Sequence, residues 1–340
     1  MTPDGPGPFP LAVINHGASG KRPPNLEQRH RLTFATFYFL SRGYAVALPM
    51  MRGFAKSQGI QLLDRCNQAE VRVRNAKDIL AVINFMSARP YINGQQVVVA
   101  GQSFGGWNSL AVGSLSHPSV KGLLNFSGGA NLSGCQDNLT ALSEGAYVLG
   151  KQTRTPSLWF YGQNDTMTST SLWQSMFRSY TSAGGPAQIV DYGYFMHDAH
   201  ELLAYPEGLK LWTPHADAFL EKLGLPHKLS YSNYLPIDAP PPTNYASISD
   251  VCAVPYLSDQ GRQVYQQFLQ APVPRAVVIS PSGLIFASFS GFDPLQRAIR
   301  SCQDEASECQ VYAADNAVTW IPSDSNTSND ACRAEISQSR

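Results

Sequence analysis

Short apolar segments recur along the first two thirds of the chain, and each is bounded by Gly, Pro or Asn. They occupy residues 11–15, 44–49, 97–100, 122–126, 157–161 and 187–192. Segments that are apolar throughout, rather than alternating with polar residues, are typical of strands covered on both faces, as in a parallel sheet. The pattern therefore predicts six buried strands.

Helical patterns lie between these strands. Residues 69–87 carry an apolar stripe at helical spacing and are followed by Pro90. Residues 211–223 carry another and are followed by Gly224, a common residue after a helix end. Strand and helix in alternation indicate an α/β domain with a doubly wound, mostly parallel sheet.

The composition changes after Pro226. Residues 227–254 contain the run APPPT and little periodicity, which is typical of a linker. A smaller α+β domain is predicted for 255–322, with helices at 258–270 and 293–302, a hairpin at 275–280 and 284–288, and one or two strands within 309–320. The predicted organisation is thus an α/β catalytic domain at 1–226, a linker at 227–254, an accessory domain at 255–322 and a polar tail at 323–340.

Charge and composition exclude some function classes. The 340 residues hold 25 basic and 25 acidic side chains, so there is no basic excess for binding nucleic acid. No segment approaches the roughly 18 continuous apolar residues of a membrane span. Hydrophobic residues make up 43% of the chain, enough for a sizeable core.

The six cysteines favour an oxidising compartment, with buried free thiols as the alternative. Cys302 and Cys309 are close enough along the chain for a local disulfide. Because the cysteines favour an oxidising compartment, we expect a secreted or periplasmic protein, and since no signal peptide stands before the first strand, we expect that it has been removed. Short glycosylation sequons occur at Asn131, Asn138 and Asn326 and matter only in a eukaryotic secretory pathway.

One motif carries chemistry. Residues 97–106 read VVVAGQSFGG, so the pattern G-x-S-x-G at Gly101, Ser103 and Gly105 directly follows a buried strand and precedes a helical segment. This context predicts a sharp strand-to-helix turn that exposes a nucleophilic serine. The alternative interpretation is a glycine-rich connection without chemistry.

A serine nucleophile needs a base, and the base needs an orienting acid. Asp165 follows the strand at 157–161, where open α/β sheets build their sites, although a turn-forming Asp is the alternative. His197 and His200 follow the last strand. His200 is the expected base and His197 an expected surface residue, and a zinc pair formed by the two lacks an evident third ligand.

Two backbone N–H groups are expected to stabilise the oxyanion. Phe104, the residue after the nucleophile, supplies one, and Ala18, in the loop after the first strand, is the expected second. His16 precedes the serine in the chain and is expected to order that loop through side-chain hydrogen bonds.

These motifs resemble the α/β-hydrolase superfamily, and more closely the bacterial dienelactone-hydrolase-like serine hydrolases. The resemblance covers roughly residues 8–225 and rests on the HG, RGFAKS, GQSFGGW, FYGQND and DAHELL segments. It implies that Ser103 is the nucleophile, Asp165 the acid and His200 the base, with no metal or organic cofactor. Ala199 and Ala55 stand where relatives often carry Gly, which affects loop shape rather than chemistry.

Two further hypotheses concern the surroundings of the serine. Trp107 and Tyr161 are candidate substrate-binding residues, with a core position as the alternative. Cys66 and Cys135 follow strands at the same sheet edge, so a disulfide between them near the pocket mouth is a hypothesis.

The predicted activity is hydrolysis of a small carboxylic ester through an acyl-enzyme. A serine peptidase of the prolyl-oligopeptidase type shares this fold and triad order, but such enzymes normally carry a propeller, for which this sequence shows no sign. A secreted binding protein with a vestigial hydrolase domain is the alternative outside enzymes. The oligomeric state stays open.

Overall fold

A computed structural model describes residues 1–18, 23–26, 28–61, 66–130, 135, 137–235, 237–289 and 293–322. The chain divides into two compact units, Met1–Leu235 and Pro236–Arg340. The division falls inside the segment 227–254 that the sequence predicts as a linker.

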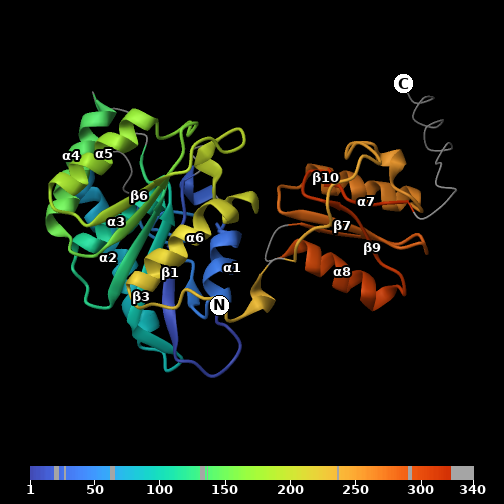
Figure 1. Cartoon of the computed structure of the whole chain (residues 1–340), viewed down its shortest axis with the longest axis horizontal. Coiled ribbons are helices and arrows are strands. Elements are labelled where there is room, and N and C mark those ends of the chain that lie inside the picture. Colours follow the sequence, from blue (N-terminus) through green and yellow to red (C-terminus); the bar gives the residue numbers. More distant parts are fainter. Residues whose placement is uncertain are drawn as a thin grey trace. The chain divides into compact units, whose positions relative to one another are not determined.

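The first unit is built on a six-stranded parallel sheet (Figure 1). Its strands are β1 (Phe9–Asn15), β2 (Ala45–Ala47), β3 (Ile92–Gln102), β4 (Val120–Phe126), β5 (Ser157–Tyr161) and β6 (Ala187–Asp191), in the order β2-β1-β3-β4-β5-β6. All six correspond to the apolar segments of the sequence, because β1, β3, β4 and β5 are covered on both faces and their buried runs leave little room for polar residues.

Helices cover both faces of this sheet, as the prediction of a doubly wound fold requires. They are α1 (Thr33–Ser41), α2 (Gln68–Ser87), α3 (Phe104–Ser114), α4 (Asn138–Gln152), α5 (Thr170–Ser182) and α6 (Glu207–Lys222). Helices α2 to α5 lie on one face, and α1 and α6 lie on the other (Figure 1). On that second face the rings of Tyr38 and Trp212 are 4.5 Å apart, and the Arg42 guanidinium pairs with Asp217 at 2.5 Å.

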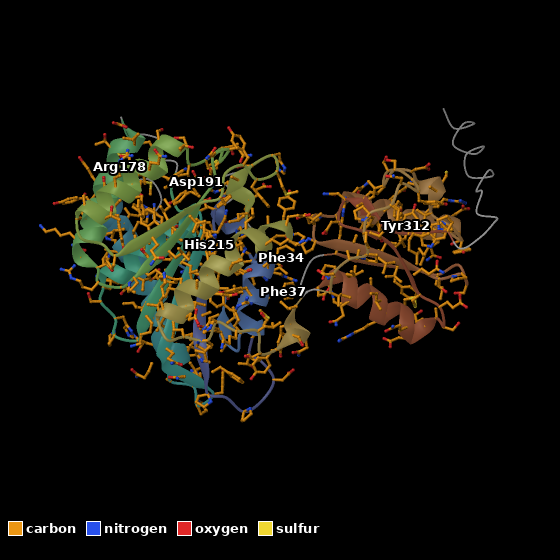
Figure 2. The ribbon with its side chains drawn as sticks, in the orientation of Figure 1. Phe34, Phe37, Arg178, Asp191, His215 and Tyr312 are labelled. Carbon is orange, nitrogen blue, oxygen red and sulfur yellow. A yellow bond between two sulfur atoms is a disulfide. The ribbon has the colours of Figure 1, made fainter. Side chains whose placement is uncertain are left out.

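Helices α4 and α5, like α1, have no counterpart in the sequence prediction. For α1 the cause is burial. Nearly all its residues are buried, including Phe34 and Phe37, whose positions on α1 Figure 2 shows. A helix that is apolar all round carries no polar stripe, so its period cannot be seen in the sequence. The predicted helices at 69–87 and 211–223, which are amphipathic, appear as α2 and α6.

The second unit is a small α+β domain, as predicted. Its strands β7 (Arg275–Ile279), β8 (Ile285–Phe289), β9 (Gln310–Ala314) and β10 (Ala317–Val318) form an antiparallel sheet in the order β10-β9-β7-β8. Helices α7 (Asp259–Gln270) and α8 (Pro294–Glu305) complete it. Alternate residues of β7 face two different cores, because Val277 packs with Tyr265 and Tyr312 while Val278 packs with Leu295 (Figure 2 labels Tyr312).

Several residues of the predicted linker contribute to this unit. Tyr245, Ile248 and Val251 pack against the core that contains Tyr265. The Tyr265 hydroxyl donates to the Ile248 carbonyl at 2.8 Å. This part of the chain is therefore bound to the second unit by ordinary core contacts.

Two disulfides join described residues. Cys302 and Cys309 are bonded, which confirms the predicted local pair, and so are Cys66 and Cys135, with Cα atoms 5.6 Å apart. Cys252 is also disulfide-bonded. The tail at 323–340 and the sequons at Asn131 and Asn326 lie outside the described residues.

Asn138 is the first residue of α4, capped by the preceding Asp137. Within the described ranges, none of the helices has the length and apolar character needed to cross a membrane.

Candidate active site

Ser103 stands on a strained turn between β3 and α3. Its φ of 55° and ψ of −123° lie in a region that residues with a Cβ rarely adopt. Three main-chain hydrogen bonds hold the turn: the Ser103 N–H donates to the Phe126 carbonyl at 2.8 Å, and the Ser103 carbonyl accepts from the N–H groups of Trp107 at 3.1 Å and Gly129 at 3.3 Å. The geometry matches the turn that the sequence motif predicts.

The two glycines of the motif are required by close backbone approaches. A Cβ at Gly101 would lie 2.4 Å from the backbone of Gly105. A Cβ at Gly105 would lie 2.2 Å from the Asn15 carbonyl oxygen at the end of β1. Both distances are far below contact, so helix α3 can begin against β1 and β3 only because these side chains are absent.

Asp165 lies in the loop after β5, and its carboxylate has no exposed surface. Oxygen Oδ1 accepts hydrogen bonds from the backbone N–H groups of Met167 at 2.9 Å and Thr168 at 2.7 Å. These two donors fix the orientation of the carboxylate within its loop.

His200 meets this carboxylate. Its Nδ1 is 3.0 Å from both Asp165 oxygens, and its side chain is 12% exposed. When Nδ1 carries the proton and donates it to a carboxylate, Nε2 is unprotonated and can accept a hydrogen bond. A general base for a serine hydroxyl needs this tautomer. The structure thus brings Asp165 and His200 together from residues 35 apart in the chain.

His197 takes a different position. Its side chain is 67% exposed, and its Nε2 lies 3.2 Å from a Glu201 carboxylate oxygen. The two histidines therefore face different carboxylates. In the described part of the chain, no group of three His, Cys, Asp or Glu side chains is arranged to hold a metal ion.

The main chain of His200 is held by two side chains that the sequence analysis did not single out. The His200 N–H donates to Asp198 Oδ1 at 2.9 Å, and Gln102 Nε2 donates to the His200 carbonyl at 3.0 Å. Asp198 also accepts from the Thr166 N–H at 3.1 Å and the Thr166 hydroxyl at 2.5 Å. Although partial burial alone raises the pKa of Asp198, the hydrogen bonds from Thr166 and His200 outweigh it and hold that pKa below its ordinary value.

The loop after β1 lies directly against the serine. A Cβ at Gly17 would be 3.2 Å from the Ser103 Cβ, and Ala18 follows it. His16 orders this loop, as expected: its Nδ1 is 2.7 Å from the Gly17 carbonyl, and its Nε2 accepts from the Met51 N–H at 3.0 Å. Phe104 is the first residue of α3, where backbone N–H groups have no acceptor within the helix.

Trp107 and Tyr161 occupy core positions. Both have no exposed surface, and both belong to the main core cluster of the first unit. The Tyr161 hydroxyl donates to the Gly128 carbonyl at 2.6 Å and accepts from Asn125 Nδ2 at 3.1 Å. Burial raises the pKa of Tyr161 well above its ordinary value. The structure therefore favours the core interpretation over substrate contact for both residues.

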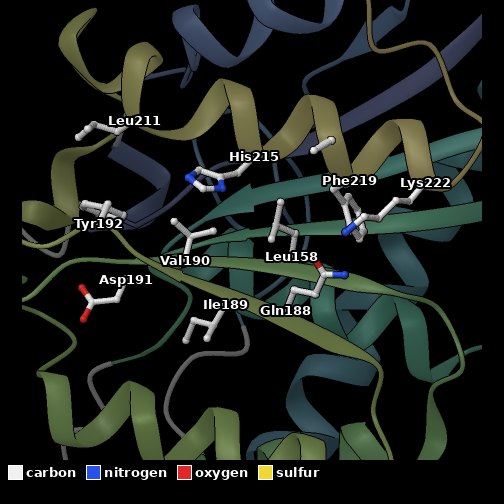
Figure 3. A pocket seen from close by; sticks show the side chains of 11 residues that line it. Leu158, Gln188, Ile189, Val190, Asp191, Tyr192, Leu211, His215, Phe219 and Lys222 are labelled. Carbon is white, nitrogen blue, oxygen red and sulfur yellow. The ribbon is translucent and has the colours of Figure 1, made fainter.

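A groove of about 540 Å³ lies between β6 and α6, away from the serine (Figure 3). Leu158, Val190 and Phe219 line it with apolar surface, and His215 and Lys222 project into it from α6. None of the residues lining it is Ser103, Asp165 or His200. The sequence held no signal for this groove because its polar residues are scattered over two elements.

The chain is similar to known proteins over part of its length. The chain matches the prolyl oligopeptidase family over residues 31–153. None of the curated protein sequences matches it.

Solved structures resemble about two thirds of the chain. A protein from Klebsiella pneumoniae subsp. pneumoniae described as a dienelactone hydrolase is 15% identical, over 65% of this chain and 89% of that one, with a TM-score of 0.43. Est1E from Butyrivibrio proteoclasticus, solved with ferulic acid, is 17% identical over 63% and 89%, with a TM-score of 0.45. An acylaminoacyl peptidase is 15% identical over 68% of this chain and 39% of that one, with a TM-score of 0.50.

The parallel sheet covered by helices on both faces is the fold that this acylaminoacyl peptidase shares. The chain therefore has an α/β-hydrolase fold and resembles hydrolases of that fold.

Proposed function

We propose that this protein is a serine hydrolase that cleaves carboxylic esters, with Ser103 as nucleophile, His200 as general base and Asp165 as orienting acid. The observation that carries the proposal is the contact of His200 Nδ1 with both Asp165 oxygens at 3.0 Å, on the sheet edge where Ser103 adopts its strained turn. The burial of Asp165 supports it, because a carboxylate shielded from water holds an imidazole in one tautomer.

The reaction proceeds in two acyl-transfer steps. Ser103 Oγ attacks the ester carbonyl while His200 Nε2 takes its proton. The N–H groups of Phe104 and Ala18 stabilise the tetrahedral oxyanion, and His200 then protonates the departing alkoxide. Water hydrolyses the acyl-enzyme by the same route in reverse. These steps need no metal or organic cofactor.

Ester cleavage is the first candidate because an alkoxide leaves more readily than an amine, although the same triad and oxyanion donors serve peptide substrates in serine peptidases. The match to the prolyl oligopeptidase family supports a serine peptidase as the second candidate. A binding protein with a vestigial hydrolase domain is the third, and the hydrogen-bonded Asp165–His200 pair speaks against it.

We place the protein outside the cytoplasm, in the periplasm or the medium. The two disulfides among the described residues support this placement, because such bonds persist in oxidising compartments. The expected partner is a small ester rather than a macromolecule.

Labelling with a fluorophosphonate probe tests the proposal. The wild-type protein should be labelled at Ser103, the Ser103→Ala variant should not, and p-nitrophenyl esters should be cleaved faster than peptide anilides. An unlabelled wild type would contradict the serine-hydrolase mechanism, and faster anilide cleavage would make the protein a peptidase.

The two histidines provide a matched pair of variants. His200→Ala should lower kcat by at least about 10³-fold, because the base is lost. His197→Ala should change kcat by less than about twofold, since that ring is 67% exposed and pairs with Glu201. The reverse ranking would exchange their roles.

A further inference from the structure

Gln102 links the serine turn to the turn that carries His200 and to the loop after β1. It is the last residue of β3 and directly precedes Ser103. Its Nε2 donates to the His200 carbonyl at 3.0 Å, across 98 residues of chain. Its Oε1 lies against the loop after β1, since a Cβ at Gly17 would be only 2.5 Å from that oxygen.

The main chain of His200 is consequently held at both its N–H and its carbonyl. Asp198 accepts from the His200 N–H at 2.9 Å. Gln102, which directly precedes the proposed nucleophile, donates to the His200 carbonyl. Asp165 holds only the Nδ1 end of the ring. The distance from Nε2 to Ser103 therefore depends on where the backbone of residue 200 lies relative to the serine turn.

The backbone around His200 has little regular structure of its own to fix that position. It forms a single three-residue 3-10 turn, Ala199–Glu201. The loop before it is joined to the acid loop by Asn164, whose Nδ2 donates to the Phe195 carbonyl at 3.2 Å. The hydrogen bond from the Gln102 amide joins this turn directly to the serine turn.

We propose that Gln102 is a positioning residue for the hydrolytic reaction, whose side-chain amide sets the separation between Ser103 and the His200 ring. This inference rests on the proposed function. Gln102 touches no reacting atom. Its role needs both a side chain of this length and an N–H donor, because the acceptor is a backbone carbonyl.

Two variants separate these requirements. Gln102→Met keeps the length of the side chain and removes the donor. Gln102→Glu keeps the shape and Oε1, but its carboxylate cannot donate until it is protonated. Gln152→Met, on the exposed last turn of α4, is the matched control.

We expect Gln102→Met to lower kcat for a p-nitrophenyl ester by about 10- to 100-fold with KM within twofold, because a displacement of the base by less than about 1 Å slows proton transfer without weakening binding. The rate of fluorophosphonate labelling should fall by a similar factor. The control should match the wild type in both assays.

The pH profile of Gln102→Glu distinguishes positioning from mere stability. Protonation of Glu restores a donor, so the ratio of its kcat to that of the wild type should rise as the pH falls from about 8 towards 5, approaching the ordinary Glu pKa of about 4.3. Taking the ratio removes the titration common to both enzymes.

A folded Gln102→Met protein that is labelled at the wild-type rate, or that loses melting temperature but not kcat, would overturn the inference and leave the proposed function intact. A pH-independent ratio for Gln102→Glu would also overturn it, and this variant carries the test if Gln102→Met does not fold. A wild type that is neither labelled nor active would overturn both.

Discussion

Replacing Asp165 by Asn tests the triad without disturbing the loop that carries it. In the structure Oδ1 of Asp165 accepts from the N–H groups of Met167 and Thr168, and both carboxylate oxygens are 3.0 Å from His200 Nδ1. Two N–H donors can be satisfied only by an oxygen. The Asn side chain must therefore keep its oxygen at the Oδ1 position and turn its NH₂ group towards His200.

In this orientation the Asn side chain disfavours the tautomer in which His200 acts as general base. An NH₂ group 3.0 Å from Nδ1 repels a proton on that nitrogen and can donate to it, so the imidazole proton is favoured on Nε2, which then cannot accept the serine proton. We expect kcat to fall by about 10⁴-fold, the size of effect that a wrong tautomer causes in a serine hydrolase. That is about 5.5 kcal/mol of transition-state stabilisation at about 1.36 kcal/mol per tenfold.

The free energy of unfolding should distinguish the Asn variant from an Ala variant at the same position. Asp165→Asn keeps both backbone hydrogen bonds, so the free energy of unfolding should change by less than about 1 kcal/mol. Asp165→Ala removes the acceptor of two N–H groups beside a side chain with no exposed surface, so it should cost at least about 2 kcal/mol. Asp191→Asn, an exposed carboxylate of β6, is the control and should leave kcat within twofold.

The assay is kcat for a p-nitrophenyl ester, measured beside urea unfolding of each variant. A folded Asp165→Asn enzyme with kcat within tenfold of the wild type would refute the tautomer argument. Equal loss of stability in Asn and Ala variants would refute the assignment of the loop hydrogen bonds.

Three other predictions concern the scaffold. Gly105→Ala should lower the free energy of unfolding by at least about 4 kcal/mol or abolish soluble expression, because its Cβ would lie 2.2 Å from a backbone oxygen of β1; a normal melting temperature would contradict this. Reducing the Cys66–Cys135 bond, which closes a sequence separation of 69, should lower stability by about 4 kcal/mol, and an intact mass unchanged on reduction would exclude the bond. Asp217→Ala should cost about 2–3 kcal/mol in urea unfolding, since it leaves the guanidinium of Arg42, 10% exposed, without its carboxylate, whereas a change below about 0.5 kcal/mol would show the pair to be neutral.

Much of the fold could be predicted from short windows of sequence. The strand at 157–161 and the helix at 69–87 appear where their patterns place them, as β5 and α2. Helix α1 could not be predicted in this way, because burial on all sides removes the polar positions that reveal a helical period.

Some features of the candidate site could likewise be predicted from local sequence, and others could not. The turn at Ser103 is encoded locally, since it needs only the flanking glycines and the strand before them. The partners of Gln102 are not encoded locally, because its acceptor is a carbonyl 98 residues away. Nothing in the residue types distinguishes a glutamine that spans two loops from one that faces water.

The sequence by itself determined the two-part organisation, the parallel sheet and the position of the serine turn, because each follows from backbone preferences and burial patterns within about 20 residues. Only the tertiary structure decided that His200 rather than His197 faces Asp165, and that Trp107 and Tyr161 lie in the core. Those outcomes depend on which strands are neighbours, and strand order brings distant loops together at one edge of the sheet.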